Sequence, residues 1–228
     1  MHLVGRRSKR DLRRHWFSVL AGLVAAACSH HSALLAPTAR DLARPAPDSF
    51  LVAFQTTRGE MDVLMRRSWS PKGVDRVYFL VRRGYYDRAR FYRVVPNYAQ
   101  FGLAAEPFLS AEWQARRLPD EPVRASNRRG VVSFARGGPG TRSVQLFVNR
   151  TDNIRLDTLN TFGFPPVGEV TAGGMAVVDS LYAGYGEMSP RGPGPSQDSV
   201  RLQGEAYLQR RFPRLDAITR ARVTREWR

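Results

Sequence analysis

The chain has 228 residues, of which 43% are hydrophobic, and this is enough for one well-buried domain with tails. All four histidines precede residue 32, and Cys28 is the only cysteine. The rest of the chain therefore lacks the groups for Ser-His-Asp or Cys-His catalysis, for the usual zinc sites and for an internal disulfide. Its chemistry must come from arginine, carboxylates, hydroxyls, amides or the backbone.

The formal net charge of +16 is carried almost entirely by arginine, since Lys9 and Lys72 are the only lysines. Beyond the N-terminus the arginines are scattered, and neither zinc-finger spacing nor a basic heptad segment is present. A nucleic-acid partner is therefore not expected.

The N-terminus has the layout of an export signal. Residues 1–15 are basic, and an uncharged apolar run follows from Trp16 to Ala27. This order predicts a signal peptide over residues 1–27, and the run is short for a membrane span. Two outcomes of processing remain open. The chain is released after the alanines, or Cys28 is lipidated as the new N-terminus, which we favour because the only cysteine directly follows the run.

Residues 28–47 contain Ser, His, Ala and two closely spaced prolines, a composition that predicts a tether. One domain is expected over residues 48–228, and no internal repeat is visible in it.

The first half of this domain combines a hairpin, a helix and a strand. The apolar pattern predicts a β-hairpin over 50–65. Ser70 is the expected N-cap of a helix over 71–83 that a glycine ends. FYRVV, 91–95, predicts a strand, and the polar stretch 103–129 is expected to be irregular.

The second half is expected to contain more short strands. The pattern predicts strands at 130–134, 144–148 and 166–170, and a structural turn in the glycine-rich segment 136–142. Apolar residues at helical spacing predict a second helix at 175–181.

A Pro/Gly loop is expected over 189–199, followed by a closing strand within 215–223. Many short strands with two helices predict a mainly β fold, a closed eight-stranded antiparallel barrel capped by the two helices.

Three motifs resemble the bacterial cyclophilin-type peptidyl-prolyl cis-trans isomerases. They are GEMDVLMRRSWSPKGVDRVYFLVRRGYYDRARFYRVVPNYAQFG, GVVSFARGGPGTRSVQLFVN and PPVGEVTAGGMAVVDSLYAGYGE. The resemblance covers residues 50–187 in the family's order, and the segment from Pro190 to Arg228 resembles the C-terminal extension of some envelope members. It implies an eight-stranded barrel with a proline-binding groove on its outer face.

The resemblance also implies roles for single residues. The catalytic arginine of FYRVVP falls on Arg93, and the family's glutamine falls on Gln100. Arg155 occupies a position that is often tryptophan, and the family's histidine has no counterpart. The implied substrate-binding positions are Phe91, Tyr98, Ala99, Ala135, Arg136, Gln145, Phe147, Leu156 and Phe164, the last of which lies nearest to the missing histidine.

The implied chemistry suits a domain without histidine or cysteine. Rotation about an X-Pro bond crosses a barrier of ~18–20 kcal/mol, and twisting makes the prolyl nitrogen a hydrogen-bond acceptor. Arg93 would donate to that nitrogen, so no metal and no cofactor are expected.

The expected partners are proline-containing segments of exported proteins, and a lipid anchor would join the monomer to the membrane of the cell envelope. The alternative is a binding module that kept the barrel and holds proline-rich segments without catalysing their isomerisation.

Overall fold

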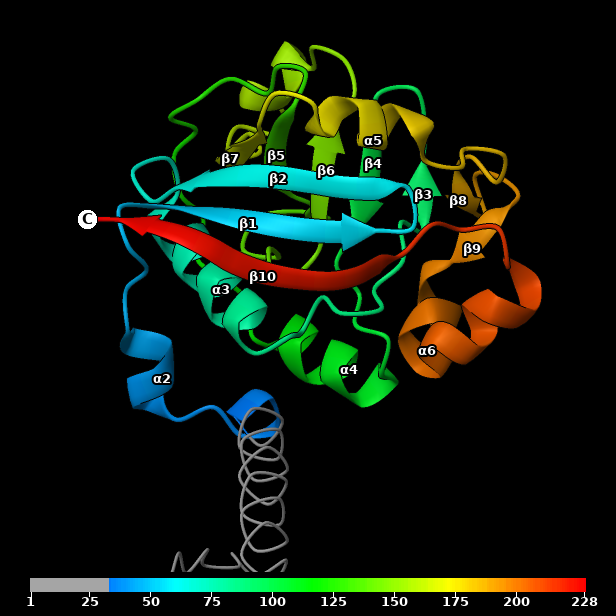
Figure 1. Ribbon diagram of the computed structural model, residues 1–228, viewed down its shortest axis with the longest axis horizontal. Coiled ribbons are helices and arrows are strands. Elements are labelled where there is room, and N and C mark those ends of the chain that lie inside the picture. Colours follow the sequence, from blue (N-terminus) through cyan, green and yellow to red (C-terminus); the bar gives the residue numbers. More distant parts are fainter. Residues whose placement is uncertain (1–32) are drawn as a thin grey trace, which may run out of the picture.

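The computed structural model describes residues 33–228, so the predicted signal peptide and the predicted lipidation site, Cys28, lie outside the described residues. Its main feature is a curled antiparallel sheet of eight strands in the order β10-β1-β2-β7-β5-β6-β4-β3 (Figure 1). The prediction of a mainly β domain is confirmed. The strands are β1 (Ser49–Thr56), β2 (Gly59–Arg66), β3 (Arg93–Val94), β4 (Tyr98–Phe101), β5 (Val131–Phe134), β6 (Leu146–Asn149), β7 (Pro166–Val170) and β10 (Ile218–Trp227).

Both predicted helices are present and lie on different sides of the sheet. The first, α3 (Pro71–Arg82), lies beside β10, and α5 (Gly174–Ser180) lies beside β2 (Figure 1). Each packs apolar residues against the core between the strands. The residues that the two helices bury there are Val74, Val77, Leu80, Val81 and Val178.

Ser70 is the N-cap residue of α3, as predicted, but a distant carboxylate binds the amides of the first turn. Ser70 makes no capping hydrogen bond, and its hydroxyl instead donates to Glu121. The Glu121 carboxylate accepts the backbone N–H groups of Lys72 at 2.8 Å and of Gly73 at 3.1 Å. A carboxylate distant in the sequence therefore satisfies the exposed amides of the first turn, where a negative charge is also favoured by the helix dipole.

One helix lies in the stretch 103–129, which was expected to be irregular. This helix, α4 (Pro107–Ala115), begins at a proline, as helices often do. It buries Leu109 and Trp113, which are one turn apart. The prediction was wrong here because two apolar positions within nine residues give little periodicity to detect.

A second unpredicted helix, α6 (Gln197–Arg211), follows a two-stranded parallel sheet of β8 (Met188–Ser189) and β9 (Gly194–Ser196). These elements replace most of the loop predicted at 189–199. The helix is interrupted at Gly204, where φ is 55°, and this breaks the apolar period. The predicted closing strand is confirmed as β10, which pairs along β1.

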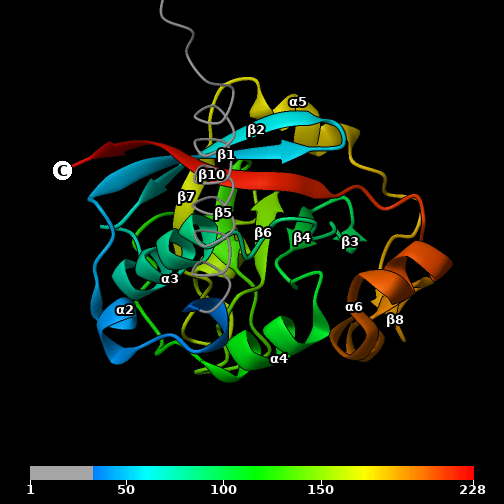
Figure 2. The same cartoon turned by 60° about the horizontal axis from the view of Figure 1, so that its bottom comes forward.

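Part of the predicted tether, from residue 33 onward, contacts the domain. Leu34 is buried, and its carbonyl accepts a hydrogen bond of 2.9 Å from the indole of Trp113. The short helix α2 (Ala39–Ala43) follows and lies beside α3 (Figure 2). Ala46 and Pro47 are also buried, but most residues between Leu34 and Ala46 are exposed, so a tether over 28–47 stays a prediction.

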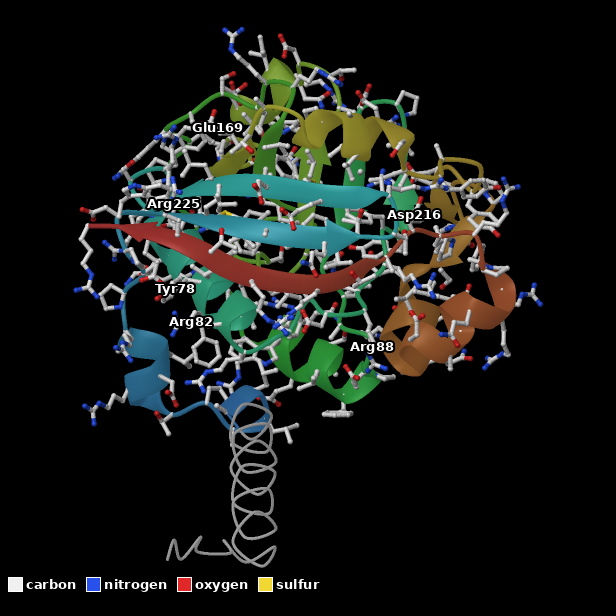
Figure 3. The ribbon with its side chains drawn as sticks, viewed as in Figure 1. Tyr78, Arg82, Arg88, Glu169, Asp216 and Arg225 are labelled. Carbon is white, nitrogen blue, oxygen red and sulfur yellow. The ribbon has the colours of Figure 1, made fainter. Side chains whose placement is uncertain are left out.

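Asp216 ties three segments together at the entrance to β10 (Figure 3). It is buried and accepts hydrogen bonds from the hydroxyl of Thr57 at 2.7 Å, from Nε of Arg58 at 2.8 Å and from the backbone N–H of Tyr182 at 2.7 Å. The turn of the first hairpin, the end of α5 and the last strand therefore share one carboxylate.

We expect Asp216→Ala to lower the free energy of unfolding by about 2–4 kcal/mol, because it leaves charged and backbone donors without their buried acceptor. The half-exposed pair of Glu112 and Arg116 offers a control, since Glu112→Ala should change stability by at most about 0.5 kcal/mol. Urea unfolding of the three proteins measures both values. Equal effects of the two substitutions would contradict the role given to Asp216.

Candidate active site

The alternation of side chains along three strands builds one polar face. Arg93 of β3 lies opposite Gln100 of β4, and Gln100 lies opposite Phe147 of β6. Tyr98 shares the face of Gln100, because residues two apart in a strand point to the same side. Gln145 precedes Phe147 by two residues and reaches the same face.

Two predicted substrate-binding residues lie on the opposite face, in the core. Ala99 stands between Tyr98 and Gln100 and is fully buried among core residues. Phe91 is also buried in the core, with its ring centroid 5.2 Å from that of Phe101. The structure therefore does not bring Phe91 or Ala99 to the site, and the alternation of the strand is the reason for Ala99.

A chain of hydrogen bonds fixes the polar groups of this face. The hydroxyl of Tyr92 donates to Oε1 of Gln145 at 2.7 Å, and Nε2 of Gln100 donates to the same oxygen at 3.1 Å. Oε1 of Gln100 accepts from Nη1 of Arg93 at 3.1 Å, and Nη2 of Arg93 donates to Oε2 of Glu187 at 2.5 Å. Each amide has a defined orientation, and the guanidinium of Arg93 is held through both of its terminal nitrogens, Nη1 and Nη2.

The guanidinium of Arg93 is partly shielded from water. Its side chain is 14% exposed, and its central carbon lies 4.6 Å from the ring centroid of Tyr98. Nε is buried and has no hydrogen-bond partner among the described residues. A shielded cation in this geometry is stabilised by the aromatic face and by its carboxylate partner.

Glu187 is a site residue that the sequence prediction missed. Burial favours its neutral form, but hydrogen bonds from Arg93 and from the backbone N–H of Met188 outweigh this effect and hold the pKa of Glu187 below its ordinary value. Little in the sequence indicates that Glu187 belongs to the site, since it lies in an irregular segment 94 residues after Arg93. Only the need of a shielded arginine for an anion could have indicated it.

A cavity of about 820 Å³ opens beside Arg93. Nearly all of the predicted site residues line it, although they come from segments far apart in the sequence. Arg155, at the position that is often tryptophan in the family, also lines the cavity. The predicted residues in its wall are Arg93, Tyr98, Gln100, Ala135, Arg136, Gln145, Phe147, Leu156 and Phe164.

The floor of the cavity is apolar and aromatic. The ring centroids of Tyr98 and Phe147 are 5.5 Å apart, and those of Phe147 and Phe164 are 6.0 Å apart in an edge-to-face arrangement. Leu156 is buried beside them in the short 3₁₀ helix η1 (Ile154–Asp157). These side chains form a surface suited to a small apolar ring, next to the guanidinium.

The opposite wall comes from elements that the sequence analysis did not predict. Helices α4 and α6 lie side by side (Figure 2), and α6 lies next to β9, which pairs with β8. They contribute Ala111, Gln114, Met188, Gln197 and Leu202 to the lining of the cavity. The cavity is therefore a space between the curled sheet and a helical wall.

The glycine-rich loop at 136–142 is a structural turn, as predicted. The backbone N–H groups of Gly137 and Gly138 both donate to Oγ1 of Thr141 at 3.0 Å. The following residue, Arg142, is fully buried and donates to Oε2 of Glu121 at 3.0 Å. The turn amides are thus satisfied within the protein, and a buried ion pair anchors the end of the loop.

Residues 33–228 lack two further features. No group of three or more His, Cys, Asp or Glu side chains in this range could hold a metal ion. No helix in the same range has both the length and the apolar character needed to cross a bilayer.

Comparison with known proteins gives one consistent family. Residues 51–201 match the family model described as cyclophilin type peptidyl-prolyl cis-trans isomerase/CLD. "Peptidyl-prolyl cis-trans isomerase-like 3" of Gibberella zeae is 30% identical over 139 residues, covering 57% of this chain and 83% of the relative. A peptidyl-prolyl cis-trans isomerase of Acinetobacter baylyi is 27% identical over 134 residues, covering 58% and 71%.

A solved structure has the same fold. The crystal structure of a cyclophilin type isomerase of Cryptosporidium parvum aligns with a TM-score of 0.56 at 17% identity, covering 78% of this chain and 99% of that one. A crystal structure of that protein in the presence of the dipeptide Ala-Pro aligns with a TM-score of 0.54.

The chain belongs to the cyclophilin-type peptidyl-prolyl cis-trans isomerase family and is an enzyme of that type. Fungal and bacterial proteins both appear among its relatives, so the shared family is broader than the bacterial group that the sequence resembles.

The contact between Glu187 and Arg93 leads to a prediction about kinetics. Glu187→Ala should lower kcat by about 5- to 30-fold with a smaller change in KM, because an ion pair of about 1–2 kcal/mol that orients the donor is lost. Glu187→Gln, which keeps an acceptor oxygen, should recover part of the loss. Steady-state kinetics with one tetrapeptide measures all three proteins.

The pH profile separates orientation from a general loss of structure. The pKa of Glu187 is below its ordinary value, so the wild type should keep a constant kcat on lowering the pH until Glu187 protonates in the acidic range. In Glu187→Gln this acidic decline should be absent. An unchanged decline in the variant would contradict a positioning role for Glu187.

Proposed function

We propose that the chain catalyses rotation about X-Pro bonds by donating a hydrogen bond from Arg93 to the prolyl nitrogen of the twisted amide. The observation that carries this proposal is the guanidinium of Arg93, held by Gln100 and Glu187 at the edge of an apolar cavity. The proposal names a mechanism for the isomerase activity of the family.

The reaction needs selective binding of one geometry and no reactive side chain. The cis and trans forms differ by only about 0.5–1 kcal/mol, while the barrier between them is ~18–20 kcal/mol. Loss of amide resonance on twisting leaves a lone pair on the prolyl nitrogen. A preorganised donor that meets this lone pair only in the twisted state lowers the barrier.

Arginine suits this role for two reasons. It stays protonated throughout the physiological pH range, so the donor is always present. Its geometry is fixed in advance, because Gln100 is itself fixed by Gln145 and Tyr92. The reorganisation required on substrate binding is therefore small.

The apolar floor would hold the pyrrolidine ring. Tyr98, Phe147, Leu156 and Phe164 offer a surface of the right chemistry next to the donor. Ala135 lies at the edge of the cavity, where a substrate backbone would pass. The related protein solved in the presence of Ala-Pro supports a proline-containing peptide as the substrate here.

Closure of the sheet into a barrel is part of this proposal, since a closed barrel would keep β3 rigid. The segment before β3 meets the segment before β10 at an isolated antiparallel bridge between Arg90 and Ala217. Backbone hydrogen bonds from Phe91 to Asp216 and from Ile218 to Ala89, of 2.9 and 2.8 Å, support it.

Arg93→Ala should keep the fold and lower kcat/KM by about two orders of magnitude, since loss of one preorganised donor typically costs about 2.7–4 kcal/mol. Arg93→Lys should also be poor, because an ammonium cannot hold Gln100 and Glu187 in the same fork. A protease-coupled or NMR exchange assay on tetrapeptides measures this, with circular dichroism as the check on folding.

Near-normal activity of Arg93→Ala would overturn the mechanism. An inactive wild type that still binds proline peptides would favour the alternative, a binding module with the same fold.

We propose further that the protein acts on exported polypeptides as a monomer in a bacterial cell envelope, held to a membrane through lipidated Cys28. The layout of residues 1–28 supports this, with a basic stretch, an apolar run and the only cysteine in order. We expect labelled fatty acid to appear on the mature protein in its native host and to be absent from Cys28→Ser. A soluble, unlabelled mature chain would agree with export but contradict the lipid anchor. A cytosolic full-length chain would contradict both export and the anchor.

A further inference from the structure

The rim of the cavity is strongly cationic. Six arginines line it, and no aspartate or glutamate within residues 33–228 does. They come from β3, from the segment after α4, from the glycine-rich loop, from η1, from the turn between β8 and β9, and from α6, so they surround the apolar floor. These residues are Arg93, Arg117, Arg136, Arg155, Arg191 and Arg201.

Arg136 is the most unusual member of this group. Its side chain is 2% exposed, and Nε and Nη1 are buried without a hydrogen-bond partner among the described residues. Asp120 lies 3.8 Å from Nη1, beyond hydrogen-bond reach, and the carbonyl of Leu159 accepts from Nη2 at 3.2 Å. A buried guanidinium with two unused donors has an unmet need for an acceptor.

Arg93 is shielded and paired with Glu187, but the other four rim arginines are exposed and weakly compensated. Neither Arg117 nor Arg155 has an ion pair within residues 33–228. Arg191 is 74% exposed and lies 3.9 Å from Glu187, which already binds Arg93. Arg201 is 48% exposed and contacts only the exposed Asp198, at 3.2 Å. Their charges therefore remain available at the mouth of the cavity.

Some arginines elsewhere in the molecule are fully paired. Away from the cavity, several arginines form paired hydrogen bonds with one carboxylate. Arg67 does so with Asp75 at 2.8 and 3.2 Å, and Arg222 does so with Asp87 at 2.9 and 2.8 Å. Arginines without an ion pair also occur away from the cavity within residues 33–228, for example Arg124 and Arg220, so the cavity is distinguished by six arginines grouped around one apolar floor.

We propose that the enzyme selects X-Pro segments flanked by acidic residues. The inference rests on the proposed function, because the apolar floor is assigned to the proline ring and the rim to the flanking side chains. Carboxylates of Asp or Glu would pair with the free arginines, and a buried rim donor such as Arg136 would donate a hydrogen bond to a carbonyl or carboxylate oxygen of the peptide. Basic flanks would be repelled by the same field.

Binding is tested first, with three fluorescent peptides that share one X-Pro core and carry Glu, Ala or Lys on both sides. We expect the Kd to rise from Glu to Ala to Lys, with at least about a tenfold difference between the ends of the series and a loss of this preference in high salt. A Glu-flanked peptide with alanine in place of proline should bind much more weakly. Catalysis is then measured as kcat/KM for the three proline peptides.

The variant Arg117→Glu/Arg201→Glu should reduce the Glu-over-Lys ratio by about tenfold or invert it. Its matched control is Arg128→Glu/Arg225→Glu, which changes the net charge equally at residues that do not line the cavity, and which should keep the wild-type ratio. Each ratio is taken within one protein, so a general loss of stability does not imitate the effect.

Equal affinity for the three peptides would overturn the proposal, as would an equal change of the ratio in the control. Tight binding of the peptide without proline, or its displacement by a short oligonucleotide at equal concentration, would assign the rim to polyanions in general. If the wild type binds with the expected preference but isomerises none of the peptides, the proposed catalysis fails and the preference stands.

Discussion

The site depends on the alternation of side chains across β3, β4 and β6. Pairing of Arg93 with Gln100, and of Gln100 with Phe147, places a cation, an amide and an aromatic ring on one face in fixed register. The intervening residues face the core, so the same hydrogen-bonded ladder stabilises the fold and positions the chemistry. A shift of one residue in β4 would exchange Gln100 for Ala99 or Phe101 and remove the contact with Arg93.

The positive charge of a shielded arginine must be compensated, and the partners of Arg93 do this while leaving its guanidinium beside the cavity. Glu187 supplies the charge, Tyr98 supplies an aromatic face, and Gln100 fixes the remaining end of the guanidinium. The amide of Gln100 is oriented in turn by Gln145. Because the network is satisfied at nearly every polar atom, it is expected to be rigid, and rigidity is what an electrostatic catalyst requires.

The C-terminal quarter of the chain contributes to both the fold and the site. β10 completes the pairing of β1, and its entrance is fixed by Asp216. The preceding α6 and the β8–β9 sheet form the wall that faces the aromatic floor. Residues that resemble an extension in sequence thus enclose the cavity, and they carry two of the arginines of its rim.

The local elements were predictable because their determinants are local. Apolar runs, turn residues and helical spacing predicted the first hairpin, α3, β5, β7 and α5. The resemblance of the motif around FYRVVP to a known family implied the residues that line the cavity near Arg93. The absence of histidine and cysteine after residue 31 limited the chemistry to groups such as arginine and amides. These properties depend on composition and on neighbours within a few positions.

Tertiary structure decided the rest. Glu187 contacts Arg93, Glu121 caps α3, and α6 lines the cavity. These contacts form because the curled sheet brings distant segments together, and no spacing in the sequence indicates them. The same applies to two residues whose types suit a pocket: strand alternation turns Ala99 into the core, and Phe91 packs in the core against Phe101. Sequence determined which side chains were present, and the packing of the sheet against its helices determined which of them share one space.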